Sequence, residues 1–123
     1  MLEPKEIVEL IKSLDRVGCG PFRYLGEDVF LNFSHYEEVE FDYQSEFIQW
    51  DSVKTYGHDY KARIDRKCKT QDERDKYYKI YEKEIPPVIL DEKGYPLDGY
   101  HRLARFKKEK ATFIAYVGVR KKK

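Results

Sequence analysis

The segment IPPVILDEKGYPLDGYHRLARFKKEKATFIAYVGV, residues 85–119, constrains the fold more than any other part of this chain. A short apolar run, PPVIL, precedes DEKG, whose final glycine is typical of a tight turn, and YPL then returns. Because proline cannot donate to a sheet ladder, Pro96 favours an edge position for that return. DGYHRLARFKKEK has the pattern of a helix that packs through Leu103 and Phe106, and ATFIAYVGV that of a strand. The order strand, hairpin, helix, strand predicts a sheet backed by helices.

The N-terminal part predicts further elements of both kinds. PKEIVELIKSLDR is an amphipathic helix that GCGP ends, because its apolar residues recur at helical spacing: Ile7, Val8, Ile11 and Leu14. Residues 22–53 are dense in aromatic and β-branched residues. Local alternation in VEFDY and FIQW favours strands there, although the pattern does not define their ends.

The middle of the chain is less regular. KTYGHDYKARIDR, residues 54–66, predicts a structured loop or a short helix. QDERDKYYKIYEKE, residues 71–84, predicts a helix whose acidic first turn suits the helix dipole and whose Tyr77, Ile80 and Tyr81 share one face. We expect this helix to cover a sheet.

The size and composition fit one α+β domain over residues 1–123, with a small mixed β-sheet and covering helices. The chain has 123 residues, of which 41% are hydrophobic, and this is enough for one modest core. Its formal net charge is +1, so the total demands no polyanionic partner. Neither an apolar leader nor a run of the ~18 apolar residues that a membrane span needs is present, so we expect a cytoplasmic protein without a membrane partner.

The residues most suggestive of chemistry lie at the start of the helix in DGYHR. Asp98 occupies a predicted N-cap, and the backbone amides of Gly99, Tyr100 and His101 precede the intrahelical ladder. Those amides, the helix dipole, the imidazole of His101 and the guanidinium of Arg102 together could bind a phosphate. Gly99 would let the backbone approach the ligand closely.

A purely structural interpretation of the same five residues stays open. In it, Asp98 caps the helix, Gly99 eases the turn, and His101 and Arg102 form a solvated first turn. A carboxylate also repels a phosphate, so Asp98 suits a binding site only beside a metal ion, a substrate hydroxyl or a proton transfer. Asp98 is therefore either a cap or a mechanistic residue.

From Ile85 to Val119 the chain resembles the ParB/sulfiredoxin-like superfamily, including the ParB-like nuclease domains. The resemblance is carried by a Pro-Pro-hydrophobic strand, a short hairpin, and D-G-x-H-R at a helix start; including the preceding helix, the family-like core spans about residues 70–119. Members include sulfiredoxins, free-serine kinases that use ADP or ATP, CTP-binding partition proteins and DNA-associated proteins. The resemblance implies that the helix start binds a nucleotide (ATP, ADP or CTP) with Mg²⁺. The role of residues 1–45 stays open.

The resemblance also implies roles for single residues. His101 and Arg102 would bind phosphate, Gly99 would be the close-approach position, and Asp98 would lie near a hydroxyl-bearing acceptor as a catalytic residue together with His101. Tyr100 stands where sulfiredoxins have their catalytic cysteine, which argues against sulfinic-acid reduction. A phosphotransferase or nucleotide hydrolase is the leading hypothesis. The alternative is a non-catalytic module that binds DNA or a protein.

Kinase-like relatives add a base from the N-terminal half, and the candidates here are Glu37, Glu38 and Asp51. The sequence does not choose among them, and solvent-facing acids are the simpler explanation.

Three weaker signals remain. RFKKEK and RKKK, together with basic residues in RIDRKCK and on the following helix, could contact a nucleic acid, but the near-neutral charge favours solvated lysines. His35 and His58 show no spacing that is diagnostic of a metal site. Cys19 and Cys68 lie far apart, so we expect reduced, partly buried thiols.

Overall fold

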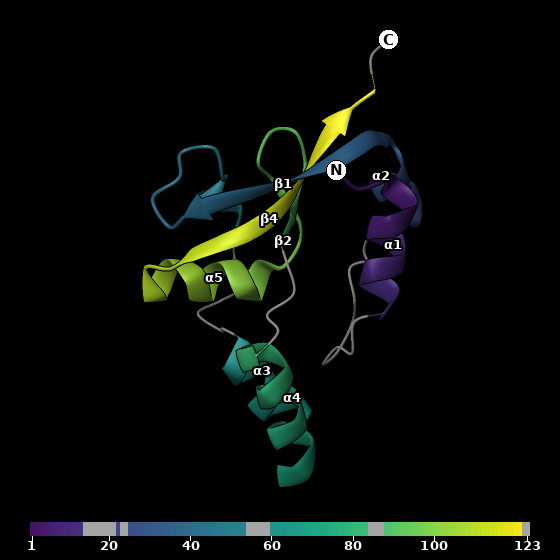
Figure 1. The fold of residues 1–123 in the computed structure, drawn as a ribbon. Coiled ribbons are helices and arrows are strands. Elements are labelled where there is room, and N and C mark those ends of the chain that lie inside the picture. Colours follow the sequence, from purple (N-terminus) through teal and green to yellow (C-terminus); the bar gives the residue numbers. More distant parts are fainter. Residues whose placement is uncertain (14–21, 23–24, 54–59, 84–87, 122–123) are drawn as a thin grey trace.

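A computed structural model gives the fold for residues 1–13, 22, 25–53, 60–83 and 88–121. It is an α+β fold around one four-stranded mixed sheet with the strand order β1-β4-β2-β3 (Figure 1). The strands are β1 (Phe33–Asp42), β2 (Val88–Leu90), β3 (Pro96–Asp98) and β4 (Thr112–Arg120). β4 pairs antiparallel with β1 and parallel with β2, and β3 pairs antiparallel with β2 at the far edge. The predicted α+β class and the edge position of Pro96 are confirmed.

The helices are α1 (Pro4–Ser13), α2 (Glu27–Leu31), α3 (Tyr60–Lys67), α4 (Gln71–Lys83) and α5 (Tyr100–Glu109), with a short 3-10 turn, η2 (Trp50–Ser52). The predicted helices at the N-terminus, at residues 71–84 and after DG are thus confirmed over α1, α4 and α5. Residues 14–16, the predicted stop at GCGP and residue 84 lie outside the described part. The predicted loop or short helix contains α3, whereas residues 54–59 lie outside the described part.

The hairpin between β2 and β3 is built around Asp91. Its Oδ1 accepts the N–H groups of Lys93 at 2.8 Å and Tyr95 at 2.9 Å. The backbone N–H of Gly94 donates to the Asp91 carbonyl oxygen at 3.1 Å, and its φ of 86° is in the left-handed region that glycine tolerates. DEKG therefore forms the predicted turn, and the two short strands leave Asp98 at the end of the sheet's edge strand.

The prediction for residues 22–53 holds only in part. VEFDY lies in β1 as far as Asp42, whereas FIQW lies in the loop after β1 and begins η2 instead of forming a strand. Tertiary packing overrides the alternation here: Ile48 and Trp50 pack in the core, and the Gln49 N–H donates to the Gly94 carbonyl oxygen at 3.0 Å. This loop thereby ties β1 to the β2–β3 turn.

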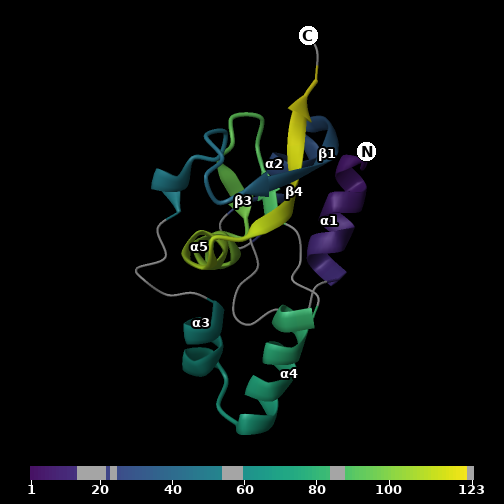
Figure 2. The same cartoon turned by 60° about the vertical axis from the view of Figure 1, so that its left-hand side comes forward.

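Two apolar clusters fill the space around the sheet. The first joins α1 and α2 to the sheet: Ile7, Val8, Ile11, Phe30, Phe33, Tyr36 and Ile89. The second packs α5 and the loop after β1 against the other strands: Ile48, Val88, Leu90, Leu103, Phe106, Phe113 and Ala115. Figure 2 shows α5 nearly end-on beneath β4, with α1 on the other side of the sheet. The predicted packing through Leu103 and Phe106 is confirmed.

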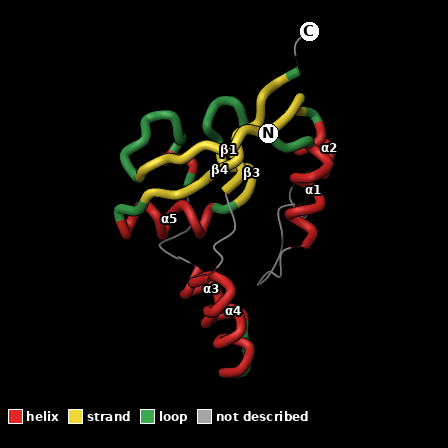
Figure 3. The backbone as a smooth tube through the Cα atoms, in the orientation of Figure 1, coloured by secondary structure: helices red, strands yellow, loops and turns green. Residues whose placement is uncertain are grey.

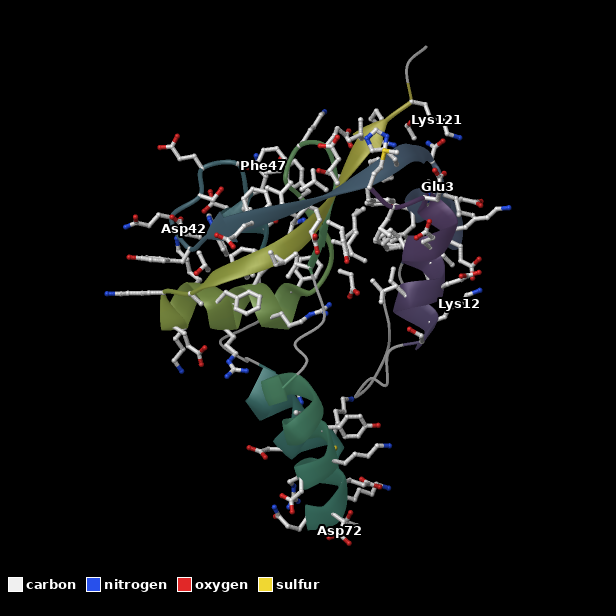
Figure 4. The ribbon with its side chains drawn as sticks, in the orientation of Figure 1. Glu3, Lys12, Asp42, Phe47, Asp72 and Lys121 are labelled. Carbon is white, nitrogen blue, oxygen red and sulfur yellow. The ribbon has the colours of Figure 1, made fainter. Side chains whose placement is uncertain are left out.

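The expectation that the helix of residues 71–84 covers the sheet is wrong. Two orientations show α3 and α4 side by side, projecting beyond α5 and away from the strands (Figures 1 and 2). Figure 3 shows the same projection as a backbone tube. Figure 4 labels Asp72 at the outer tip of this projection. The sequence of α4 is dominated by charged and tyrosine residues, which gives it little apolar surface to bury against a sheet.

In the part of the chain that is described, none of the helices is both long and apolar enough to cross a membrane.

Candidate functional site

The DGYHR segment joins the edge strand β3 to α5, and its turn differs in detail from the sequence-based expectation. Asp98 is the last residue of β3, and the N-cap of α5 is Gly99, not Asp98. Gly99 has φ 102° and ψ 27°, a left-handed conformation that puts Asp98 one residue outside the helix. The first intrahelical hydrogen bond runs from the Leu103 N–H to the Gly99 carbonyl oxygen at 2.8 Å.

Asp98 and Arg102 form an ion pair inside the protein. Arg102 Nη2 lies 3.2 Å from Asp98 Oδ2, and their side chains are only 6% and 7% exposed. The two side chains meet because the left-handed turn at Gly99 and the first turn of α5 bring Arg102 back beside the last residue of β3. Arg102 is therefore not the solvated first-turn residue of the purely structural interpretation, and Asp98 lies one residue before the N-cap, the position that was predicted for it.

The space above Gly99 is already filled by its neighbours. A Cβ atom placed there would lie 3.1 Å from Arg102 Nη2 and 3.1 Å from Val88 Cγ2. The glycine thus leaves room for a close neighbour, and in this structure that neighbour is the Arg102 guanidinium. The close approach of a ligand at Gly99 stays a prediction. The nearness of Val88 to Gly99 was not foreseen, although the strand-turn-helix order of the segment could have indicated it.

Tyr100, the first residue of α5, turns back over the hairpin. Its hydroxyl donates to the Pro96 carbonyl oxygen at 3.0 Å, and the residue remains 39% exposed. Partial burial, and to a lesser extent the carboxylate of Asp91, raises the pKa of its phenol. Tyr100 therefore stays neutral at physiological pH and keeps this hydrogen bond as a donor.

His101 occupies the second position of α5, so its backbone lies in the first turn as predicted; its side chain lies outside the described part. The backbone amides of Tyr100 and His101 come before the first intrahelical bond and are at the positive end of the helix dipole. The arrangement can therefore offer amide donors beside a buried guanidinium.

The candidate bases from the N-terminal half do not gather at this site. Glu37 and Glu38 lie on β1, three strand positions from β3, which corresponds to about 14 Å at the usual strand spacing. Glu37 Oε1 instead lies 3.2 Å from His35 Nε2. Asp51 lies in η2, within the loop that contacts Gly94, so it is the candidate on the hairpin side of the sheet.

The histidines, cysteines and C-terminal lysines noted in the sequence do not form a further site within the described residues. Among the described residues, no group of three or more His, Cys, Asp or Glu side chains could hold a metal ion; His58 lies outside that set. Cys68 is a buried free thiol whose pKa burial raises, and Cys19 is not among the described residues. Lys121 is exposed at the end of β4 (Figure 4), and Lys122 and Lys123 lie beyond the described part.

Comparison with known proteins gives no match to this chain: no family model, no curated protein and no solved structure matches it significantly.

Proposed function

We propose that this protein is a ParB/sulfiredoxin-like domain that binds a nucleotide or another phosphorylated ligand at the start of α5. One observation carries the proposal. Within the described residues, the buried polar or charged residues are Asp98 and Arg102, both from DGYHR. Desolvation offsets most of the attraction within a buried ion pair, so such a pair adds little stability over an apolar core. Buried charged groups are frequent at functional sites, which favours a binding role for this pair.

The residues present fit a phosphate group. The amides that begin α5 and the guanidinium of Arg102 are the donors that phosphate oxygens prefer. Asp98 holds Arg102 in place through Oδ2, and it also reduces the positive charge available to an anion. A bound Mg²⁺ ion would compensate for this carboxylate, which is why a metal-nucleotide complex fits better than free phosphate.

In the catalytic form of the proposal, a bound nucleotide would supply the phosphoryl group. Arg102 and His101 would bind phosphate oxygens, and Asp98 would orient the hydroxyl of an acceptor. Because Asp98 is buried and paired, its first task is to position Arg102. In the competing proposal the same domain is a DNA- or protein-binding module, and its basic C-terminal residues make the contacts.

Calorimetric titration with Mg²⁺ complexes of ATP, ADP, CTP and GTP, and with inorganic phosphate, tests the proposal. We expect one of them to bind the wild type, and His101→Ala with Arg102→Lys to weaken that affinity at least tenfold. Lys108→Ala is the matched control, because it removes an exposed charge from the same helix. At a concentration of about 100 times its Kd, the ligand would stabilise the fold by ~2.7 kcal/mol, which thermal unfolding also detects.

Three results separate the alternatives. Binding that Lys108→Ala reduces as much as the double variant would place the ligand elsewhere. Absence of binding for every probe, with both proteins folded, would contradict the proposal. Salt-dependent DNA affinity that depends on Lys121 to Lys123 would instead establish the competing module. Where a nucleotide binds, Asp98→Asn is measured for both affinity and turnover, because Asp98 also positions Arg102. Turnover that falls further than affinity would support an enzyme, whereas a loss of affinity alone would leave Asp98 as the positioning partner of Arg102.

A further inference from the structure

The outer edge of β1 is an open strand edge. It is the edge of the sheet opposite β3, the strand that leads into the α5 site. β1 is the first strand in the order β1-β4-β2-β3, so one side of it pairs with β4, and no strand among the described residues lies along the other side. Leu2 forms a single antiparallel bridge there: the N–H groups of Leu2 and Tyr36 each donate to the carbonyl oxygen of the other at 2.8 Å. This bridge shows that the edge accepts an extended backbone.

The edge continues past Tyr36 with polar backbone groups directed outward. Backbone N–H and C=O groups point to the two sides of a strand in alternation, so those of Glu38 and Glu40 point the same way as those of Tyr36. The register with β4 is regular from His35 to Asp42, which keeps this alternation intact. Among the described residues, no backbone group of another element bonds to Glu38 or Glu40.

Exposed acidic side chains follow the same edge. Glu38 and Glu40 pair with Tyr116 and Ile114 of β4, so the four side chains share one face of the sheet. Both glutamates are exposed, and Ile114 is 37% exposed, so α1 and α2 leave this half of the face uncovered. Figure 4 shows Asp42, the last residue of β1, at the end of the strand away from α1.

The opposite face of the same stretch is apolar. Val39 and Phe41 alternate with the glutamates and are half-buried, and the ring of Phe41 stacks on that of Phe47 with centroids 5.7 Å apart. Phe47 itself is 37% exposed. An added strand would therefore meet acidic neighbours on one face and apolar neighbours on the other.

We propose that the outer edge of β1 binds an extended peptide that alternates basic and apolar residues, by addition of an antiparallel strand. Lysine or arginine residues would lie opposite Glu38 and Glu40, and an apolar residue would lie opposite Val39. A second copy of β1 fits poorly, because antiparallel pairing centred on Val39 would put Glu38 of each copy opposite Glu40 of the other, and like charges directly opposite are destabilising. The partner is therefore a basic segment and not the same strand.

The hydrogen-bond pattern sharpens this proposal. Residues opposite Glu38 and Glu40 would form hydrogen-bonded pairs, in which each residue both donates to and accepts from its partner. The backbone amides of the basic residues would thus point at β1, and those of the apolar residues would point away. Blocking the first set should abolish binding, whereas blocking the second should not.

A short peptide that alternates lysine with valine is the probe, and amide NMR shifts of the isotope-labelled protein report its binding. We expect shifts and slowed amide exchange at Glu38 and Glu40. N-methylation of the lysine amides should abolish them, while N-methylation of the valine amides should preserve them. Equal binding of the two methylated peptides would overturn strand addition, since only long-range charge attraction would then remain. This arm uses the wild-type protein alone.

Reversing the charges of Glu38 and Glu40 provides a second test of strand addition. Glu38→Lys with Glu40→Lys should weaken the lysine peptide about tenfold or more and create affinity for a peptide that alternates glutamate with valine. Glu6→Lys with Glu9→Lys on α1 makes the same change in net charge at exposed positions and should alter affinity less than about threefold. Equal losses in the two double variants would overturn the proposal, as would sedimentation showing that the wild type dimerises through β1.

Discussion

The two ends of α5 carry ion pairs of the same spacing in opposite surroundings. At the N-terminal end, Arg102 and Asp98 lie 3.2 Å apart with both side chains nearly fully buried; at the C-terminal end, Arg105 Nε lies 2.9 Å from Glu109 Oε1, and Glu109 is half exposed. Equal spacing therefore does not give equal energetics. Loss of either partner leaves a buried charge unpaired by this contact at the first end, whereas at the second end water can reach the half-exposed Glu109.

The backbone adds a second contrast between these ends. Gly99 precedes α5 and Lys110 follows it, and both have positive φ values, 102° and 55°. The left-handed conformation suits a glycine and strains a lysine, so the helix is preceded by a residue adapted to its conformation and followed by one that is not. Four substitutions test how far the two ends differ.

The largest effect is expected from Arg102→Met. It leaves the Asp98 carboxylate buried without this partner, and we expect the free energy of unfolding to fall by about 3–5 kcal/mol. Urea unfolding measures the change, and Lys108→Met on the exposed side of α5 is the matched control. Adding Asp98→Asn to Arg102→Met should recover part of the loss. A loss below about 1 kcal/mol would mean that water reaches Asp98 readily.

Gly99→Ala should have the next largest effect, a loss of about 1–3 kcal/mol, because alanine is strained at positive φ. Its Cβ would also meet the guanidinium of Arg102 and Val88 at 3.1–3.2 Å, so these neighbours must shift. Thermal unfolding gives the change in stability. Unchanged stability would contradict the left-handed N-cap.

Lys110→Gly should change stability in the opposite direction. Glycine relieves the strain of the left-handed residue after α5, and we expect a gain of about 0.5–1 kcal/mol. The Lys110 backbone N–H keeps its bond to the Lys107 carbonyl oxygen. The same thermal measurement applies, and a loss of stability would show that the lysine side chain contributes more than its backbone strain costs.

Glu109→Gln should have the smallest effect, a change of less than about 0.5 kcal/mol in either direction. It removes an ion pair whose carboxylate is half exposed, but it also removes a negative charge from the negative end of the helix dipole. Chemical unfolding in low and high salt checks this, because any contribution of the pair should decrease with salt. A loss comparable to that of Arg102→Met would erase the contrast between the two ends.

Turn residues and apolar spacing within short stretches of the sequence were enough to predict the β2–β3 turn and the buried faces of two helices. The DEKG turn follows from a carboxylate that accepts local N–H groups and a glycine at positive φ, and the helical faces of α1 and α5 follow from apolar spacing. FIQW was mistaken for a strand because alternation of apolar and polar residues does not reveal that Ile48 and Trp50 pack into the core from a loop. The position of α4 was also not predicted, because its sequence indicates a helix but does not indicate which surface the helix packs against.

For the candidate site, the sequence by itself determined the residue types, their order and the four-residue spacing of Asp98 and Arg102. The tertiary structure decided that Gly99 and not Asp98 is the N-cap, that the two charges are buried together, and that Glu37 and Glu38 lie across the sheet. Spacing fixes which side chains can meet along one helix turn. Burial and strand order depend on contacts between segments far apart in the chain, and no local pattern encodes them.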